Sequence, residues 1–176
     1  MKIFIFGIAF LLSLNVWGQK KNAPSPPPAK THSYTANELG GVLKTDFPSE
    51  FKAASNQDKR GKAVNVSAQQ NGSAYLLNYM VHIYPLGIMP VEALSEAVLN
   101  NFAETSKSEI IESKDIDEKG YKGKAALLVN HEKAKMYEYR CFIINQMQVQ
   151  MMVVHPLGYS DEANIAKFFN SFEWKR

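Results

Sequence analysis

The stretch KAVNVSAQQNGSAYLLNYMVHIY, from Lys62 to Tyr84, decides the fold. At its centre lies Asn71-Gly72, a dipeptide that favours a two-residue hairpin turn because both turn positions need positive φ. We therefore predict a hairpin of two strands, 62–70 and 73–84. The turn sets the register, which makes one face wholly apolar and the other face mixed. The apolar pairs are Val64 with Tyr79, Val66 with Leu77 and Ala68 with Tyr75, and the mixed pairs are Asn65 with Asn78 and Ser67 with Leu76.

Short turns and prolines divide the rest of the chain into further elements. The other predicted strands are 42–47, 109–116, 124–131, 135–144 and 147–155. A helix is expected at about 90–105, and a second one near the C-terminus, capped by Ser160. Their predicted apolar stripes are Val91, Leu94, Val98 and Phe102 in the first helix, and Ile165, Phe168, Phe169 and Phe172 in the second.

This order of elements predicts an α+β fold. Strands that follow one another through short turns form a largely antiparallel β-sheet, here of about six to seven strands flanked by two helices. The strands in 73–84 and 135–155 carry apolar residues on both faces, so helices or long loops should cover the sheet on both sides.

The N-terminal residues have the pattern of a cleavable signal peptide. A positive Lys2 precedes an apolar run, and small residues lead to a cleavage site between Gly18 and Gln19. The uncharged stretch is too short and too interrupted for a membrane-spanning helix. We expect residues 1–18 to be the signal peptide, 19–38 a Pro-rich disordered tether and 39–176 a single α+β domain. The protein would then be exported, to the periplasm or the extracellular space, with no membrane span after cleavage.

Composition narrows the function classes further. The formal net charge is only +3, with no basic cluster, which argues against a nucleic-acid partner. Cys141 is the only cysteine, so neither an internal disulfide nor a lipid-anchored cysteine after the apolar run is available. Its place in an apolar strand pattern favours a buried side chain over a reactive thiol.

No residue pattern indicates catalysis or a bound metal. The histidines His82, His131 and His155 lie near predicted strand ends without the spacing of metal ligands, and there is no Gly-x-Ser-x-Gly motif. We predict no catalytic residue, no metal and no cofactor. Five methionines could offer Cu(I) ligands, but adaptable packing is the favoured interpretation. They are Met80, Met136, Met147, Met151 and Met152.

A mixed surface is the candidate binding site. If Asn145-Gln146 is a two-residue turn, Arg140 pairs with Met151 and Glu138 pairs with Val153 on one sheet face. An Arg–Glu pair at the rim of a helix-covered core would explain this face structurally. As a binding interpretation, the hypothesis is a site that comprises Asn78, Met80, Arg140 and Met151.

Three segments also resemble a known family. They are Gly41-Val42-Leu43-Lys44-Thr45-Asp46-Phe47-Pro48, Gly120-Tyr121-Lys122-Gly123 and Lys167-Phe168-Phe169-Asn170-Ser171-Phe172. In order and spacing they resemble exported bacterial members of the PsbP-like α/β/α sandwich superfamily, which includes the extrinsic P subunit of photosystem II and the Ran-binding Mog protein. The resemblance covers roughly residues 39–174. It implies an antiparallel sheet between helices and a binding or accessory role, and it transfers no functional residue.

The sequence thus favours an exported accessory domain that is not an enzyme and that binds a protein or an apolar ligand of the cell envelope. The alternative is an envelope hydrolase or metal-dependent enzyme, whose site would be assembled from the strand-end histidines.

Overall fold

The computed structural model describes residues 31–87, 89–159 and 161–176. The predicted signal peptide at 1–18, the first part of the predicted tether and Ser160 lie outside these residues. In chain order the elements are β1 (His32–Glu38), β2 (Gly41–Phe47), β3 (Phe51–Asp58), β4 (Gly61–Gln70), β5 (Ser73–His82), α1 (Val91–Ser106), β6 (Glu109–Glu118), β7 (Tyr121–Asn130), β8 (Lys135–Ile144), β9 (Met147–Pro156), α2 (Glu162–Asn170) and β10 (Glu173–Lys175).

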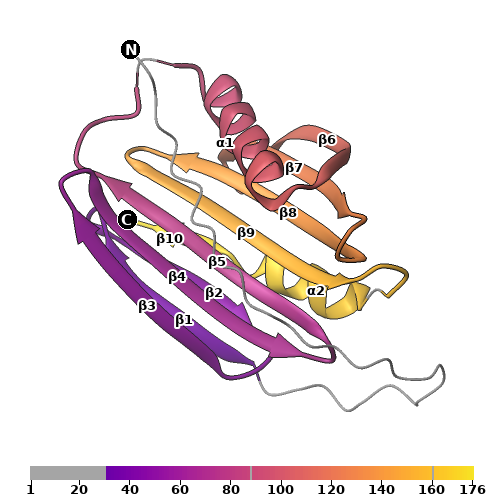
Figure 1. The fold of residues 1–176 in the computed structure, drawn as a ribbon. Coiled ribbons are helices and arrows are strands. Elements are labelled where there is room, and N and C mark those ends of the chain that lie inside the picture. The colour runs from indigo at the N-terminus through magenta and orange to yellow at the C-terminus, as the bar shows by residue number, and fades with distance from the viewer. Residues whose placement is uncertain (1–30, 88, 160) are drawn as a thin grey trace.

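A seven-stranded sheet with the order β3-β4-β5-β9-β8-β7-β6 forms the middle of the molecule (Figure 1). Every neighbouring pair in it is antiparallel. The α+β class, the antiparallel sheet and the two flanking helices are therefore confirmed. A second sheet, with the order β1-β2-β10, was not predicted.

The predicted hairpin is present in the predicted register. Asn71 and Gly72 have φ values of 51° and 79°, as a two-residue turn with both positions left-handed requires. All five predicted pairs between β4 and β5 occur. The turn at Asn145 likewise places Arg140 opposite Met151, and Glu138 opposite Val153.

Three strands are missing from the prediction, namely β1, β3 and β10. Strand β1 lies within the predicted tether and pairs along its whole length with β2, so the predicted domain start at residue 39 is wrong. The turn between these strands is Leu39-Gly40, with φ values of 52° and 72°. Leucine is rarely found at positive φ, so the sequence carries only half of the usual turn signal there.

A buried carboxylate ties β1 to the large sheet. Glu38 is 7% exposed, and it accepts hydrogen bonds from Lys62 Nζ at 2.6 Å and from Tyr79 Oη at 2.8 Å. Lys62 neutralises its charge. Because a buried charge is costly without such partners, this contact fixes the small sheet in one position over β4 and β5.

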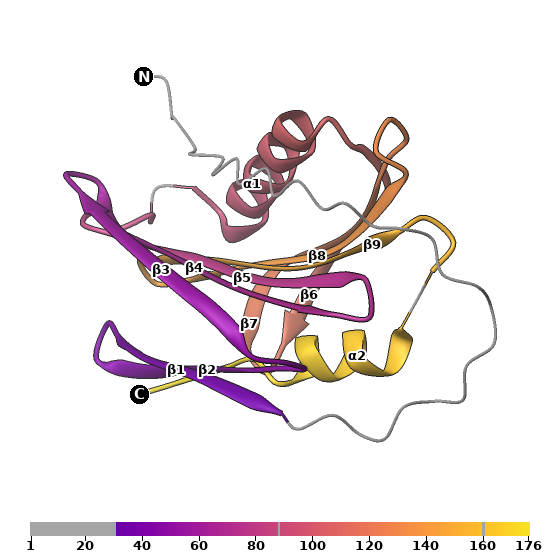
Figure 2. The same ribbon diagram turned by 60° about the horizontal axis from the view of Figure 1, so that its bottom comes forward.

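The large sheet lies between two unequal layers (Figure 2). Its inner face, which carries Tyr75, Leu77 and Tyr79, packs against α2 and the small sheet. Its outer face, which carries Leu76, Asn78 and Met80, holds α1. These faces alternate along β5 because successive side chains of a strand point to opposite sides.

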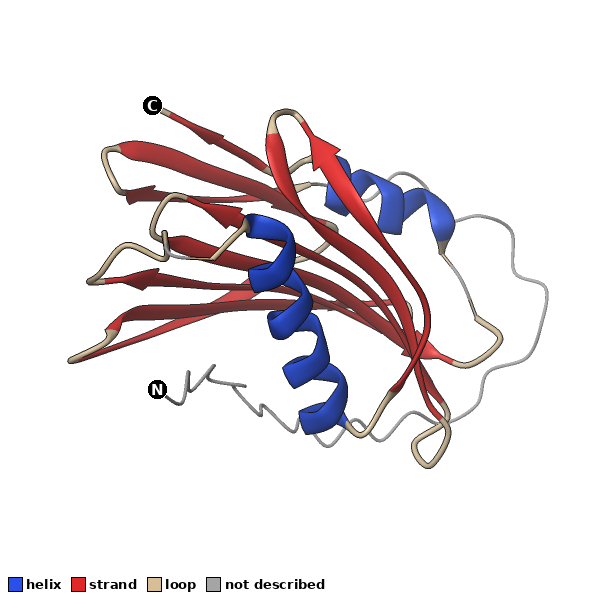
Figure 3. Ribbon diagram, turned by 90° about the horizontal axis from the view of Figure 1, so that it is seen from above, coloured by secondary structure: helices blue, strands red, loops and turns tan. Residues whose placement is uncertain are grey.

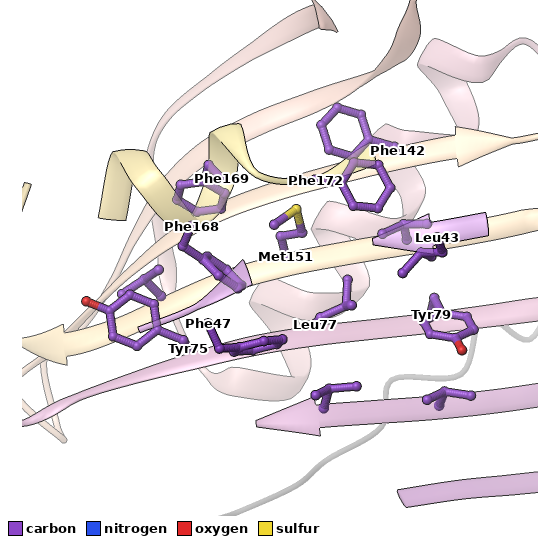
Figure 4. Packing of buried hydrophobic residues seen from close by; sticks show 14 of the residues in the cluster. Leu43, Phe47, Tyr75, Leu77, Tyr79, Phe142, Met151, Phe168, Phe169 and Phe172 are labelled. Carbon is purple, nitrogen blue, oxygen red and sulfur yellow. The ribbon is translucent and has the colours of Figure 1, made fainter. Parts of the chain in front are cut away.

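The main core fills the inner side (Figure 4). Phe168 from α2 meets Phe47 and Tyr75, with ring centroids 5.2 and 5.5 Å apart. Phe172 stacks on Phe142 at 5.4 Å. Helix α2, the small sheet and the large sheet are thus joined by one aromatic cluster.

The helices differ from the prediction in detail. In α1, Leu94 and Val98 are buried as predicted, while Val91 and Phe102 are half-buried. Helix α2 is capped by Asp161, whose carboxylate accepts from the Asn164 backbone N–H; the predicted cap, Ser160, lies outside the described residues. The stripe of α2 is buried as predicted, although the helix ends before Phe172.

Candidate functional site

The structure does not bring the four predicted binding residues together. Leu77 pairs with Met151, and Met151 pairs with Arg140, so Met151 and Arg140 lie on the inner face. Asn78 and Met80 belong to the alternate positions of β5 and lie on the outer face. The interpretation of these four residues as one surface is therefore wrong.

The two inner residues have structural surroundings. Met151 is fully buried in the main core. Arg140 Nη1 donates to Glu118 Oε2, and the guanidinium lies 4.5 Å from the centroid of the Phe169 ring. The expected Arg–Glu pair at the rim of a core is present, but the carboxylate comes from Glu118 and not from Glu138.

The outer face is only partly covered by a helix. Helix α1 packs against β6, β7 and β8. Figure 3 shows α1 crossing that side of the sheet, and in Figure 1 it lies near β6, β7 and β8, away from β3 and β4. We call the outer-face positions of β4, β5 and β9 the open face. Apart from the positions that pack against the core under α1, such as Leu76, its half-buried residues are Ala63, Asn65, Ser67, Asn78, Met80 and Gln150, and Gln148 belongs to it at only 8% exposure.

Carboxamides dominate the centre of the open face. Asn65, Asn78 and Gln150 stand directly opposite one another on three neighbouring strands, and Gln148 lies one position along. Among the described residues none of these four side chains forms a hydrogen bond. Each carboxamide both donates and accepts, so this row offers uncharged hydrogen-bonding groups to a second molecule.

On the α1 side of the row, the first charge is neutralised within the fold; on the β3 side, the exposed Lys52 stands opposite Ser67. Following the row toward α1, Gln150 is opposite Cys141, and Cys141 is opposite Lys124. Lys124 Nζ lies 3.0 Å from Asp115 Oδ1 and also pairs with Glu96 on α1, and these two carboxylates raise its pKa. The row is therefore electrically neutral up to the point where the helix covers the sheet.

Exposed apolar residues adjoin this face. The segment 83–87 follows β5 and leads to the side of the sheet on which α1 lies (Figure 2). Ile83 and Tyr84 are 52% and 75% exposed, and Met89 is exposed before the helix begins. The open face thus combines neutral polar groups with an apolar, aromatic margin.

A second polar group lies at one end of the inner face. We call Gln70, Ser73, Tyr75, Glu138 and His155 the end cluster; the register places them at neighbouring positions of β4, β5, β8 and β9. Four polar atoms in it are buried without a hydrogen-bond partner among the described residues. They are Gln70 Oε1, Ser73 Oγ, Tyr75 Oη and His155 Nε2.

His155 is the titratable centre of the end cluster. Its side chain is 2% exposed, its Nε2 lies 3.5 Å from Glu138 Oε1, and its Nδ1 lies 3.1 Å from the Pro156 carbonyl oxygen. Burial lowers the pKa of His155, but the Glu138 carboxylate and nearby backbone carbonyls outweigh burial and raise it above its usual value.

This shift gives His155 a pH-dependent contribution to stability. A raised pKa in the folded state stabilises the protein fully below about pH 6.5, and the gain is lost as pH rises through the raised value. Glu138→Gln removes the carboxylate, so we expect its loss of unfolding free energy to be largest at low pH and to shrink as pH rises. Urea titrations across this range measure the difference. The control Glu109→Gln removes an exposed carboxylate beside exposed His131 and should show little pH dependence; an equal response of both variants would contradict the assignment.

The strand-end histidines do not converge. His155 and His131 lie at the end of the sheet where the turn joins β7 to β8. His82 is the last residue of β5, at the opposite end of the sheet, where it pairs with Gly61. Within residues 31–87, 89–159 and 161–176, no group of three His, Cys, Asp or Glu side chains has the geometry of a metal site. The methionines are also divided, since Met147 and Met151 are buried in the inner core and Met152 lies under α1.

Sequence reasoning identified Asn65 and Asn78 as a pair but overlooked Gln148 and Gln150. The signal was present, because these glutamines occupy alternate positions at the start of β9, where they share one face. The two glutamines were overlooked because most other residues of β9 are apolar.

Comparison with known proteins finds a structural likeness only. No family model matches the chain, and no curated protein matches it in sequence. The solution structure of cyanobacterial PsbP (CyanoP) from Synechocystis sp. PCC 6803 aligns with a TM-score of 0.58 at 9% identity, over 87% of this chain and 97% of that chain. The chain has a PsbP-like fold. A crystal structure from Bacteroides thetaiotaomicron aligns over 76% of this chain and 45% of that chain, with a TM-score of 0.36 at 9% identity.

The PsbP-like fold agrees with the resemblance noted in the sequence. At this level of identity it establishes the architecture and leaves the function to the surface of the molecule. None of the helices in the described part of the chain is both long and apolar enough to span a bilayer.

Proposed function

We propose that this chain is an exported, non-catalytic accessory domain that binds another protein through the open face. The observation that carries the proposal is the neutral carboxamide row of Asn65, Asn78 and Gln150, together with the exposed Ile83 and Tyr84 that follow the end of β5. The centres of protein interfaces are depleted of charge and enriched in Tyr and Met, and the open face with its margin has this composition.

The chemistry of the row favours a protein surface over a purely apolar ligand. Unpaired carboxamides would lose their hydrogen bonds to water against an apolar molecule, and that loss is costly. A protein partner can supply backbone or side-chain groups to each of them, while Tyr84 and Met80 provide apolar contact area.

The surroundings of the polar side chains support a role without catalysis. The end cluster contains a histidine, a carboxylate and a hydroxyl, but His155, Tyr75 and Ser73 are each at most 2% exposed. A catalytic site needs such groups at a surface that a substrate can reach. Export is supported by the signal-peptide pattern of residues 1–18.

The test places a photo-reactive phenylalanine analogue at Tyr84, which exchanges one exposed aromatic side chain for another. Irradiation in the native host should give an adduct with one protein partner. Adding Asn78→Asp, an isosteric change that puts a charge into the neutral row, should lower the adduct yield by about tenfold or more. Mass spectrometry of the adduct should show a chain that begins at Gln19.

The matched control is Asn37→Asp, the same isosteric change at an exposed position of β1 on the other side of the molecule. It should leave the adduct yield unchanged. Equal yields for both Asp variants, or no discrete adduct, would overturn the binding proposal. Retention of residues 1–18 in the exported fraction would separately overturn the proposal of signal cleavage.

A further inference from the structure

The two edges of the large sheet are built differently. Edge strand β6 carries charges along most of its length and has an irregular register between Ile110 and Glu112. Charges and bulges are the usual means by which proteins stop an edge strand from pairing with another chain. Strand β3, at the other edge, has a regular register with β4 and carries charge only near its ends, at Lys52 and Asp58; the segment 53–57 (Ala-Ala-Ser-Asn-Gln) is uncharged.

No described strand pairs with the edge of β3 that points away from β4. Its residues from Lys52 to Asp58 are all exposed, and within the described part of the chain β4 is the sole strand that pairs with it. In Figure 1 it forms the border of the sheet, on the side away from α1. A regular strand of eight residues is thus presented to solvent along one edge.

The register identifies the backbone groups that are unpaired. The Asn71-Gly72 turn makes Gln70 and Ser73 a hydrogen-bonded pair, so alternate residues of β4 bond to β5 and the residues between them bond to β3. The Ile83 N–H, which donates to the Arg60 carbonyl, continues that alternation. It follows that Ala53, Ser55 and Gln57 direct their N–H and C=O groups away from β4.

We propose that β3 pairs with β3 of a second copy of this chain, antiparallel and centred on Ser55. Two-fold symmetry about Ser55 sets Lys52 of each copy opposite Asp58 of the other, and the two side chains lie on the same face because both positions are even-numbered. Opposite charges at directly opposed positions stabilise a strand pair. A two-fold axis at any other residue of β3 would not place Lys52 opposite Asp58.

The Asp58 carboxylate is suited to this contact. Hydrogen bonds from the Arg60 side chain and backbone lower the pKa of Asp58 and keep it ionised. The opposed small residues in the middle, Ala53 with Gln57 and Ala54 with Asn56, leave room for the two backbones to approach to the usual distance between strands. The dimer therefore carries one continuous antiparallel sheet through both copies.

Sedimentation equilibrium of the purified mature protein tests this, together with Ser55→Pro. Proline removes the outward N–H of Ser55 in both copies and leaves the hydrogen bonds to β4 in place, as an edge strand permits. We expect a concentration-dependent dimer, with a dissociation constant that rises about tenfold or more in Ser55→Pro. The same substitution on the opposite edge, Ser113→Pro, is the matched control and should leave the dimer unchanged.

A cysteine at the symmetry axis tests the register independently. Hydrogen-bonded antiparallel pairs have Cα atoms about 5.5 Å apart, inside the range of a disulfide. Ser55→Cys should therefore give a cross-linked dimer on mild oxidation, whereas Ser113→Cys should not. The native Cys141 is fully buried and does not compete. A protein that remains monomeric at all concentrations, or equal cross-linking of both cysteine variants, would overturn the proposal.

Discussion

Replacing Phe168 with alanine is expected to lower the free energy of unfolding by about 3–5 kcal/mol. Its side chain is 1% exposed and makes ring contacts to Phe47 on β2, Tyr75 on β5 and Phe169 on its own helix. Truncation leaves a cavity where the small sheet, the large sheet and α2 meet, and surrounding structure relaxes only partially into such a cavity. Chemical denaturation measures the loss.

Two further variants make this result specific. Phe172→Ala should cost a comparable amount, because Phe172 stacks on Phe142 and is 2% exposed. Lys167→Ala, on the exposed side of α2, removes only an exposed hydrogen bond to Thr31 and should change stability by less than about 1 kcal/mol. Small, equal effects for all three would show that α2 is not packed as described.

Gly123→Ala is expected to lower the free energy of unfolding by a similar amount, about 3 kcal/mol or more, for a different reason. Gly123 is buried on β7 and pairs with Phe142 of β8. A Cβ at this position would collide with the carbonyl oxygen of Cys141, which belongs to the backbone and cannot rotate away. The strands β7 and β8 would have to separate, and β8 is an interior strand next to the central strand β9.

The matched control is Gly87→Ala. Apart from its neighbours in the chain, no atom of the described residues lies within 4 Å of a Cβ built on Gly87, which belongs to the loop before α1, and its φ is not in the left-handed region. This variant should have nearly wild-type stability in the same denaturation experiment. If Gly123→Ala were equally neutral, the close approach of β7 to β8 at Cys141 would be wrong.

Local signals explain which parts of the fold could be predicted. Where both strands of a hairpin flank Asn71-Gly72, the turn chemistry and the apolar alternation agree, and the register followed from the sequence. Strand β3 has one half-buried residue, Phe51, in eight, so it has no apolar pattern to detect. Strand β10 has three residues, and only its pairing with distant β2 makes it a strand.

The prediction of the candidate site was wrong because it depended on how two strands far apart in the sequence pair with each other. The faces of the hairpin β4–β5 and of the hairpin β8–β9 were each assigned correctly. Their relation depends on the pairing of β5 with β9, which sets Leu77 and not Asn78 opposite Met151. Strands separated by a whole helix and three other strands carry no turn that specifies register, so a slip of one residue exchanged the two faces.

The late position of β10 in the chain has a consequence for the order of folding. Its Glu173 pairs with Lys44, 129 residues earlier (173 minus 44), and the Trp174 indole donates to the Glu38 carbonyl at 3.2 Å. The hairpin of β1 and β2 leaves the ribosome first, yet it lacks its second neighbour until residues 173–175 follow. Contacts of such large sequence separation form slowly. The small sheet is therefore expected to close late in folding, and until then the apolar side of β2, with Leu43 and Phe47, stays exposed to other chains and chaperones.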